Sequence, residues 1–401
     1  MQSARGTLLK TKLAIDGGKP VRATWLPYGK QSIDDNDIGA VIKVLKSDFL
    51  TTGPAVDAFE EAVAEFSEMP YAVSFSSATA ALHAVMALIK VEKGKRVVTT
   101  PNTFAATSNA VLYNQGTVEF QDVEPHTLNL DADRLRNLND VTAVIPVDFG
   151  GNPCDYEKFL ALKKQYGFRL INDASHSLGA TYRGKPVGTW ADLSIFSFHP
   201  VKSMTTGEGG LVVTKNEDEA KWLKAFRAHG ISRTDIPGFY RQDFLGFNYR
   251  MTDIQAALGT SQLKKLPVFI QRRREIVDQY RRFFSQLADY VEGPVETKGA
   301  ESAWHLFPLR LKLDKLKVDR DQFLRALHAE NIGANVHYIP VHWHPYYTKL
   351  GFKRGICPIY EAEYLREVSL PLYPGMVEQD VQDVCDAIEK LVATYSSTQL
   401  A

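Results

Sequence analysis

One lysine stands in a setting that a surface lysine does not need. Lys202 lies in the stretch SFHPVKSMTTGEGG, residues 197–210, just after the apolar run LSIFSF, 193–198, which is typical of a buried strand. A lysine becomes a nucleophile when burial or neighbouring cations favour its neutral form, and it can then attack a carbonyl carbon. Lys202 is therefore a candidate catalytic residue, and Ser197 is a candidate hydrogen-bond donor to a phosphate. An ordinary turn before the next strand explains the glycines well.

A second apolar run ends in a carboxylate residue. Asp173 ends FRLIND, residues 168–173, and His176 follows three residues later. A buried carboxylate must find a cation or a hydrogen-bond donor, or its desolvation destabilises the fold. Taken alone, Asp173 is better explained as the cap of the turn that follows it.

A third feature is a predicted helix start that suits an anion. In SSATAAL, residues 76–82, a strand ends and a helix begins, so the N–H groups of Ala78 and Thr79 are free for a phosphate. An ordinary cap by Ser77 explains the same residues equally well. Neither GxGxxG nor GxxxxGK lies near, which argues against a dinucleotide or P-loop site.

Together the three features suit pyridoxal phosphate. This cofactor needs a lysine that binds it covalently, an acid beside its pyridine nitrogen and an anion cradle. It also needs a flat surface over its ring, and Phe104 follows the apolar run RVVTT, 96–100, in a position to serve.

Seven short apolar runs predict the elements that position these residues. Helical patterns separate most of them, so we expect an α/β sheet covered on both faces. Ligands bind beyond the carboxyl ends of strands in such sheets, where all three features fall. The runs are 71–75, 96–100, 117–123, 142–149, 168–173, 193–198 and 210–215.

The pattern changes after Met251. A helix is predicted to start at Thr252 and Asp253, to break at Pro267 and to resume as a second long helix. A smaller α+β region follows, with strand-like runs at 306–313 and 334–339 and helices at 319–332 and 378–395. We therefore predict a large cofactor-binding domain with an N-terminal arm, residues 1–266, and a small C-terminal domain, residues 267–401.

The overall composition excludes several classes. Lys+Arg and Asp+Glu both number 47 in the 401 residues, and this balance argues against a nucleic-acid partner. No run approaches the length of a membrane span, and the N-terminus lacks the apolar core of a signal peptide. The three cysteines are scattered, which indicates a reducing compartment. We expect a cytoplasmic protein without a membrane partner.

Over nearly its whole length the chain resembles the DegT/DnrJ/StrS family of nucleotide-sugar aminotransferases. The runs that carry the resemblance are LTTGPAVDAFEEAVAEF (50–66), SSATAALH (76–83), TTPNTFAATSNAVLY (99–113), NDASHSLGATYRGKPVG (172–188), FSFHPVKSMTTGEGG (196–210), NYRMTDIQAALGTSQLKKL (248–266), VHYIPVHWHPYY (336–347) and LPLYPG (370–375). The resemblance implies a type I aminotransferase fold, with a mostly parallel seven-stranded sheet between helices and a smaller C-terminal α+β domain. It also implies a homodimer with shared active sites.

The resemblance implies a role for each candidate residue. Lys202 would hold the cofactor and act as general acid/base, Asp173 would pair with the pyridine nitrogen, and His176 would lie near the ring hydroxyl. The phosphate would bind Ala78, Thr79 and Ser197, with Asn248 reaching it from the neighbouring subunit, and Phe104 would stack on the ring.

The implied reaction has two halves. L-Glutamate gives its amino group to the cofactor and leaves as 2-oxoglutarate, and a keto group on a nucleotide-linked sugar then accepts the amine. The resemblance is strongest to members that aminate C4 of UDP-linked 4-keto-6-deoxy sugars for surface glycans. A 3-keto sugar, or a dTDP- or GDP-linked one, remains an alternative.

The histidines in HYIPVHWH, residues 337–344, raise a further question. Their spacing fits a metal site, but prolines interrupt the segment and no carboxylate or cysteine lies close by, so we predict no metal. We expect His337 and Tyr338 to face the sugar nucleotide or its phosphates. Two competing functions are an NAD-dependent sugar oxidoreductase, disfavoured by the missing glycine fingerprint, and a non-catalytic regulator, disfavoured by Lys202.

Overall fold

The computed structural model describes residues 12–233 and 235–397, and a seven-stranded sheet forms its centre. The prediction of a mostly parallel sheet is confirmed, because only β9 runs antiparallel to its neighbours. The strands in spatial order are β1 (Tyr71–Phe75), β9 (Gly210–Thr214), β8 (Leu193–Ser197), β5 (Arg169–Asp173), β4 (Val141–Ile145), β2 (Arg96–Thr99) and β3 (Thr117–Phe120).

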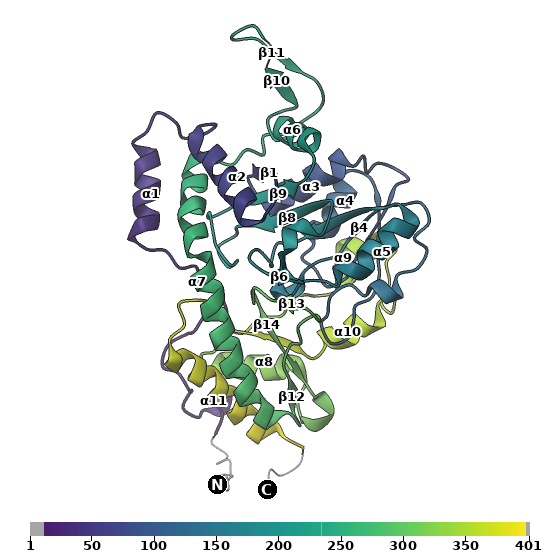
Figure 1. Ribbon diagram of the computed structural model, residues 1–401. Helices are drawn as coiled ribbons and strands as arrows, with labels where there is room; N and C mark the ends of the chain where they lie inside the picture. The colour runs from purple at the N-terminus through teal and green to yellow at the C-terminus, as the bar shows by residue number, and fades with distance from the viewer. Residues whose placement is uncertain (1–11, 234, 398–401) are drawn as a thin grey trace.

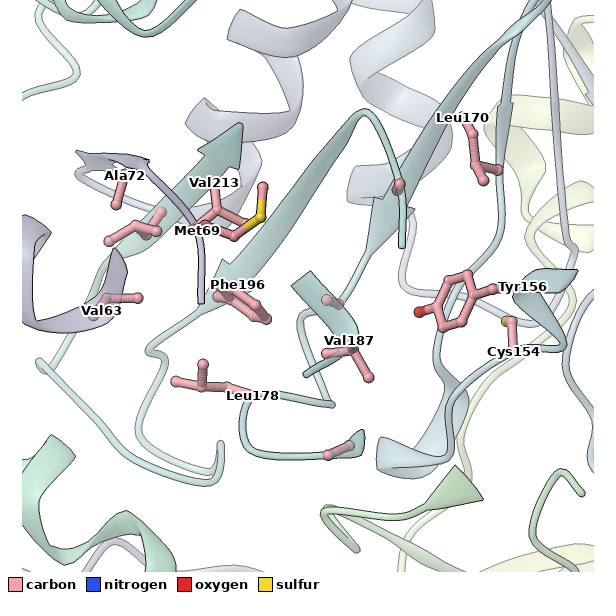
Figure 2. Close-up of a cluster of buried hydrophobic side chains, with 14 of the residues drawn as sticks. Val63, Met69, Ala72, Cys154, Tyr156, Leu170, Leu178, Val187, Phe196 and Val213 are labelled. Atoms are coloured by element: carbon pink, nitrogen blue, oxygen red, sulfur yellow. The ribbon is translucent and has the colours of Figure 1, made fainter. Parts of the chain in front are cut away.

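Helices cover this sheet on both faces (Figure 1). Neighbouring residues of one strand point to opposite faces, so Phe196 packs in one buried core and Ile195 in another. Figure 2 shows Met69, Ala72 and Val213 beside Phe196 in the first core. The covering helices are α2 (Pro54–Phe66), α3 (Ala78–Leu88), α4 (Ala106–Tyr113), α5 (Tyr156–Tyr166) and α6 (Glu217–Phe226).

The predicted break at Pro267 is wrong. Helix α7 (Asp253–Phe284) runs through that residue without interruption and extends along the molecule from α1 (Asp35–Leu45) to α11 (Glu378–Tyr395) (Figure 1). Proline destabilises a helix interior by about 3 kcal/mol. Packing on both sides of it offsets this, because Leu266 and Ile270 lie in the first core and Ile276 lies in the core of the C-terminal region.

The C-terminal region is built on a small antiparallel sheet of β12 (Val291–Glu292), β14 (Phe307–Leu311) and β15 (Glu367–Leu370). Leu13 and Leu26 from the N-terminal arm pack in its core. The run 334–339 forms no strand; only Asn335 pairs with Ser369 of β15, and the residues after it turn toward the large sheet as a loop. The helices are α8 (Arg320–Ala329), α9 (Pro345–Lys349), α10 (Pro358–Tyr364) and α11.

The remaining strands lie outside these sheets. Strands β6 (Thr181–Tyr182), β7 (Lys185–Pro186) and β13 (Ala300–Glu301) form a small sheet, and β10 (Ile231–Arg233) pairs with β11 (Tyr240–Gln242) in a projecting hairpin (Figure 1). Among the helices of residues 12–233 and 235–397, none is long and apolar enough to cross a membrane.

Candidate active site

A cavity of about 570 Å³ lies at the carboxyl ends of β5 and β8, beside the first turn of α3. It brings together every predicted site residue except Asn248. These are Lys202, Asp173, His176, Ser197, Ala78, Thr79, Phe104, His337 and Tyr338, drawn from both regions of the chain. The site therefore forms only when the loop around residue 337 packs over the large sheet.

Lys202 is held in the loop that follows β8. Its backbone N–H donates to the His199 carbonyl at 2.9 Å, and the next two residues, Ser203 and Met204, are buried. Burial disfavours the ammonium form and lowers the pKa of Lys202 from 10.5 to about 8, although the nearby Asp173 carboxylate acts in the opposite direction. The side chain is thus close to the point where it can both accept and release a proton near neutral pH.

In the cofactor-free protein we expect the rate of Lys202 acetylation to rise through about pH 8. Only the neutral amine reacts, and a pKa below 10.5 makes Lys202 neutral at lower pH than an ordinary lysine. Peptide mass spectrometry after brief acetylation, between about pH 6 and 11, measures this midpoint. The exposed Lys93 is the reference in the same sample. Equal midpoints for the two lysines would contradict the prediction.

Asp173 is 5% exposed, and each of its carboxylate oxygens accepts a hydrogen bond. Its Oδ2 accepts from Thr107 Oγ1 at 2.6 Å, and Thr107 contacts Thr103 Oγ1, also at 2.6 Å. Its Oδ1 accepts from the Ser175 N–H at 3.2 Å, so Asp173 does cap the following turn. The same carboxylate also lines the cavity, and the two explanations considered from the sequence are therefore compatible.

His176 is fixed at both ring nitrogens. Nδ1 accepts from the Gly150 N–H at 3.2 Å, so the neutral ring carries its proton on Nε2, which lies 3.1 Å from the Tyr338 hydroxyl. Burial, with smaller contributions from Lys202 and His337, places the His176 pKa well below its usual value. His176 is therefore neutral, and its one ring N–H donates to Tyr338, which also lines the cavity.

The first turn of α3 offers backbone donors to the cavity. Ser77 caps the helix, with its Oγ accepting from the Ala80 N–H at 3.1 Å, as one reading of the sequence required. The N–H groups of Ala78 and Thr79 precede it and have no acceptor within the helix. At Gly210 a Cβ would lie 2.4 Å from the Ala78 nitrogen, so glycine is needed where β9 passes this turn.

Aromatic and imidazole rings line the opposite side. Phe104 lies in the loop before α4, is 63% exposed and has its ring centroid 6.2 Å from that of Tyr338. His337 is 7% exposed, and its Nδ1 has no partner among the described residues. A buried polar atom without a partner indicates that a ligand or water completes its hydrogen bonding.

Asn248 lies outside the cavity. It is exposed, and its backbone pairs with Ala228.

The other two histidines of the segment 337–344 do not line the cavity either. His342 is buried against Glu361, with Nε2 2.8 Å from Oε1, and His344 is absent from the cavity lining. Over the described ranges no three histidine, cysteine or acidic side chains form a group that could hold a metal.

Tyr28, Thr107 and His305 are among the cavity residues that the sequence analysis did not single out. Thr107 reaches Asp173 because the first turn of α4 lies beside the end of β5, and nothing in its local sequence signals this. Tyr28 comes from the N-terminal arm. His305 is buried with its ring centroid 4.4 Å from that of His176, and a histidine inside the apolar run AWHLF was the one available signal.

These residues fit pyridoxal phosphate. A lysine with a lowered pKa and a buried carboxylate share one cavity, free helix N–H groups suit the phosphate, and the His337 ring lines the same cavity. The cavity thus combines a nucleophilic amine, an acid for the pyridine nitrogen and an anion cradle.

Comparison with known proteins agrees with this chemistry. The DegT/DnrJ/EryC1/StrS aminotransferase family matches residues 31–389. A UDP-4-amino-4,6-dideoxy-N-acetyl-beta-L-altrosamine transaminase of Campylobacter jejuni is 39% identical over 373 residues, 90% of this chain and 96% of that protein. The spore coat polysaccharide biosynthesis protein SpsC of Bacillus subtilis is 37% identical over 384 residues, 92% of this chain and 98% of that protein.

Solved structures give the same result. Helicobacter pylori PseC, an aminotransferase involved in the biosynthesis of pseudoaminic acid, superimposes with a TM-score of 0.86 at 32% identity, covering 92% of this chain and 99% of that one. The PLP-form of the putative sugar aminotransferase Spr1654 from Streptococcus pneumoniae also gives 0.86, at 28% identity, covering 92% and 98%. The predicted fold and enzyme class are confirmed, and the oxidoreductase alternative is wrong. The chain belongs to the DegT/DnrJ/EryC1/StrS aminotransferase family and is a pyridoxal-phosphate-dependent aminotransferase.

Proposed function

We propose that the protein transfers the amino group of L-glutamate to C4 of a UDP-linked 4-keto-6-deoxy sugar, giving an amino sugar for a surface glycan. The observation that carries the transfer is the shared cavity of Lys202 and Asp173 next to the α3 N-terminus. The choice of sugar is supported by the 39% identity to the altrosamine transaminase, whose name specifies a UDP-linked 4-amino product.

Each site residue has a distinct task in this proposal. Lys202 would hold the cofactor covalently and would act as the general acid/base that moves the substrate proton in both halves. Asp173, oriented by Thr107, keeps the pyridine nitrogen protonated. When bound, the cofactor supplies an electron sink that stabilises the negative charge left by proton removal.

The remaining residues bind and orient. Ala78, Thr79 and Ser197 hold the phosphate at the start of α3, where the helix dipole favours an anion. His176 would lie near the ring hydroxyl, and Phe104 would cover the flat face of the ring. His337 and Tyr338 lie on the sugar side.

The active unit is a homodimer in the cytoplasm, with Asn248 reaching the phosphate of the neighbouring subunit's site. The exposed position of Asn248 outside the cavity of its own chain supports this arrangement, and the three free cysteines support a reducing compartment.

Complementation tests the shared site. Lys202→Ala and Asn248→Ala are each expected to be defective, but their unfolded and co-refolded mixture should regain about one quarter of wild-type activity. Half of the dimers are then mixed, and each mixed dimer has one intact site. Light scattering measures the dimer. A mixture no more active than the two separate variants would contradict a shared site.

The function itself is tested in two halves. Wild-type protein is loaded with pyridoxal phosphate and given L-glutamate, and visible absorbance follows conversion of the cofactor to its amine form. A UDP-linked 4-keto-6-deoxy sugar is then added, and NMR identifies the product. We expect amination at C4. Faster conversion of a 3-keto sugar, or of a dTDP- or GDP-linked one, would replace the proposed substrate, and no response to glutamate would replace the donor.

A further inference from the structure

The N-terminal arm supplies a wall of the cavity. Leu26 is buried, its N–H donates to the Asn331 carbonyl at 2.9 Å, and its carbonyl accepts from the Gly333 N–H at 2.7 Å. Two residues later the Tyr28 carbonyl accepts from the Leu372 N–H at 3.0 Å. These bonds fix the arm against the C-terminal region on both sides of Pro27. Tyr28 is therefore a rigidly held cavity residue rather than part of a loose end.

Tyr28 lies between the lysine loop and the 337 loop. Its ring centroid is 5.5 Å from that of His337. The neighbouring Gly29 approaches Val201, the residue before Lys202: a Cβ built on the glycine would lie 3.6 Å from the Val201 Cβ. The wall formed by Tyr28, Asn335 and His337 thus borders the space in front of Lys202.

The hydrogen bonds of this wall leave a donor free. Asn335 Oδ1 accepts from the Val336 N–H at 2.8 Å, so the amide Nδ2 is its remaining polar group. Burial raises the pKa of Tyr28, and the neighbouring Asn335 side chain lowers it by less. The Tyr28 phenol is therefore protonated at neutral pH, and as a cavity-lining group it can donate to a ligand.

His337 adds a second polar group to the wall. Its backbone N–H donates to Glu367 Oε2 at 3.1 Å, which fixes the residue, and its imidazole ring lines the cavity. Burial lowers the pKa of His337 to about 3, with a smaller effect of Lys202, so the ring is neutral at working pH.

The charge on the wall decides which part of a substrate it can bind. In the described part of the chain, Lys202 is the one lysine or arginine that lines the cavity, and Glu208 and Asp173 add negative charge. A diphosphate needs cations or several free backbone N–H groups. The wall instead offers a phenol and a neutral imidazole, which suit a hydroxyl or amide.

We propose that Tyr28 and His337 form a subsite for an uncharged polar substituent of the sugar, a hydroxyl or acetamido group, and that Tyr28 is a specificity-determining residue. This inference rests on the proposed function. It narrows the expectation that His337 faces the sugar nucleotide or its phosphates: in this proposal the diphosphate lies outside this wall, and hydrogen bonds from the arm orient the sugar ring toward Lys202.

Tyr28→Phe removes one hydroxyl and keeps the ring. With the amine-loaded holoenzyme we expect the KM for the UDP-linked 4-keto sugar to rise about three- to tenfold, the loss of one hydrogen bond. The dissociation constant of UDP, measured by calorimetry, should change less than about twofold because UDP lacks the sugar. The glutamate half-reaction should keep its wild-type rate. Tyr166→Phe, at the end of α5 and remote from the cavity, is the matched control.

His337→Leu provides the second measurement, because leucine has no hydrogen-bonding group while Tyr28 stays in place. We expect the same pattern, a raised sugar KM with unchanged UDP affinity. Equal weakening of UDP and sugar would assign the wall to the diphosphate and overturn the inference, as would an unchanged sugar KM in both variants. If the wild-type enzyme does not aminate the keto sugar, the proposed function is wrong. That result differs from a failure of this inference, in which the wild-type enzyme aminates the sugar but the variants weaken UDP and sugar equally or leave the sugar KM unchanged.

Discussion

Lys202→Ala is expected to slow both halves of the amine transfer by about 10²- to 10⁴-fold, the range of a lost general acid/base. No other lysine or arginine of the described chain lines the cavity, so no second ammonium can take over. Stopped-flow absorbance with glutamate measures the first half. Product formation from the keto sugar measures the second.

Three controls test the proton-transfer role of Lys202. Lys202→Arg keeps a cation that does not lose its proton in proteins, so it should be as inactive as the alanine variant. Lys221→Ala, an exposed lysine on α6, should have wild-type rates. Added ethylamine should restore part of the activity of Lys202→Ala, since a small amine can enter the space that the side chain leaves. A variant that retains more than about one tenth of the rate would remove Lys202 from the mechanism.

Asp173→Asn is expected to lower turnover by about 10²- to 10³-fold and to weaken cofactor binding. The amide has the size of the carboxylate and can still accept from Thr107, but it has no charge to keep the pyridine nitrogen protonated. Breaking one partner of a buried charge pair typically removes about 3–5 kcal/mol. Turnover and the dissociation constant of pyridoxal phosphate, from fluorescence titration, are the two readouts.

Thr107→Val tests the same site with a smaller change. It removes the 2.6 Å hydrogen bond to Asp173 Oδ2 but leaves the charge, so the effect should be about tenfold or less. Similar losses in Asp173→Asn and Thr107→Val would mean that orientation, rather than charge, is the contribution of Asp173. An Asp173→Asn variant with normal turnover would exclude the carboxylate from the pyridine site.

Local patterns predicted much of the large sheet. The runs 71–75, 193–198 and 210–215 became β1, β8 and β9 within one residue, because continuously apolar segments between polar turns have few alternatives to a buried strand. The run 142–149 was less well predicted: β4 ends at Ile145, and the chain then turns at Phe149–Gly151 to meet residues 303–306. Apolar character alone does not distinguish a strand from a buried turn.

The α7 helix shows where a local rule fails. Proline removes one N–H and so predicts a break, but burial of Leu266 and Ile270 on either side of Pro267 makes the unbroken helix more stable. The predicted division between residues 266 and 267 stays a prediction, and this helix passes through it. Residues 13–26 likewise pack with the C-terminal core, although they come first in the chain.

By itself the sequence determined the chemistry and the residues nearest to it. A lysine, an aspartate and a helix start each follow an apolar strand, and parallel strands bring their carboxyl ends to one edge, so Lys202, Asp173 and Ala78 were predictable from order alone. Only the tertiary structure decided which distant side chains complete the cavity. Packing of the N-terminal arm, helix α4 and the C-terminal region brings Tyr28, Thr107 and His305 to the cavity. Such contacts depend on how whole surfaces fit together, and no periodic pattern in the sequence predicts them.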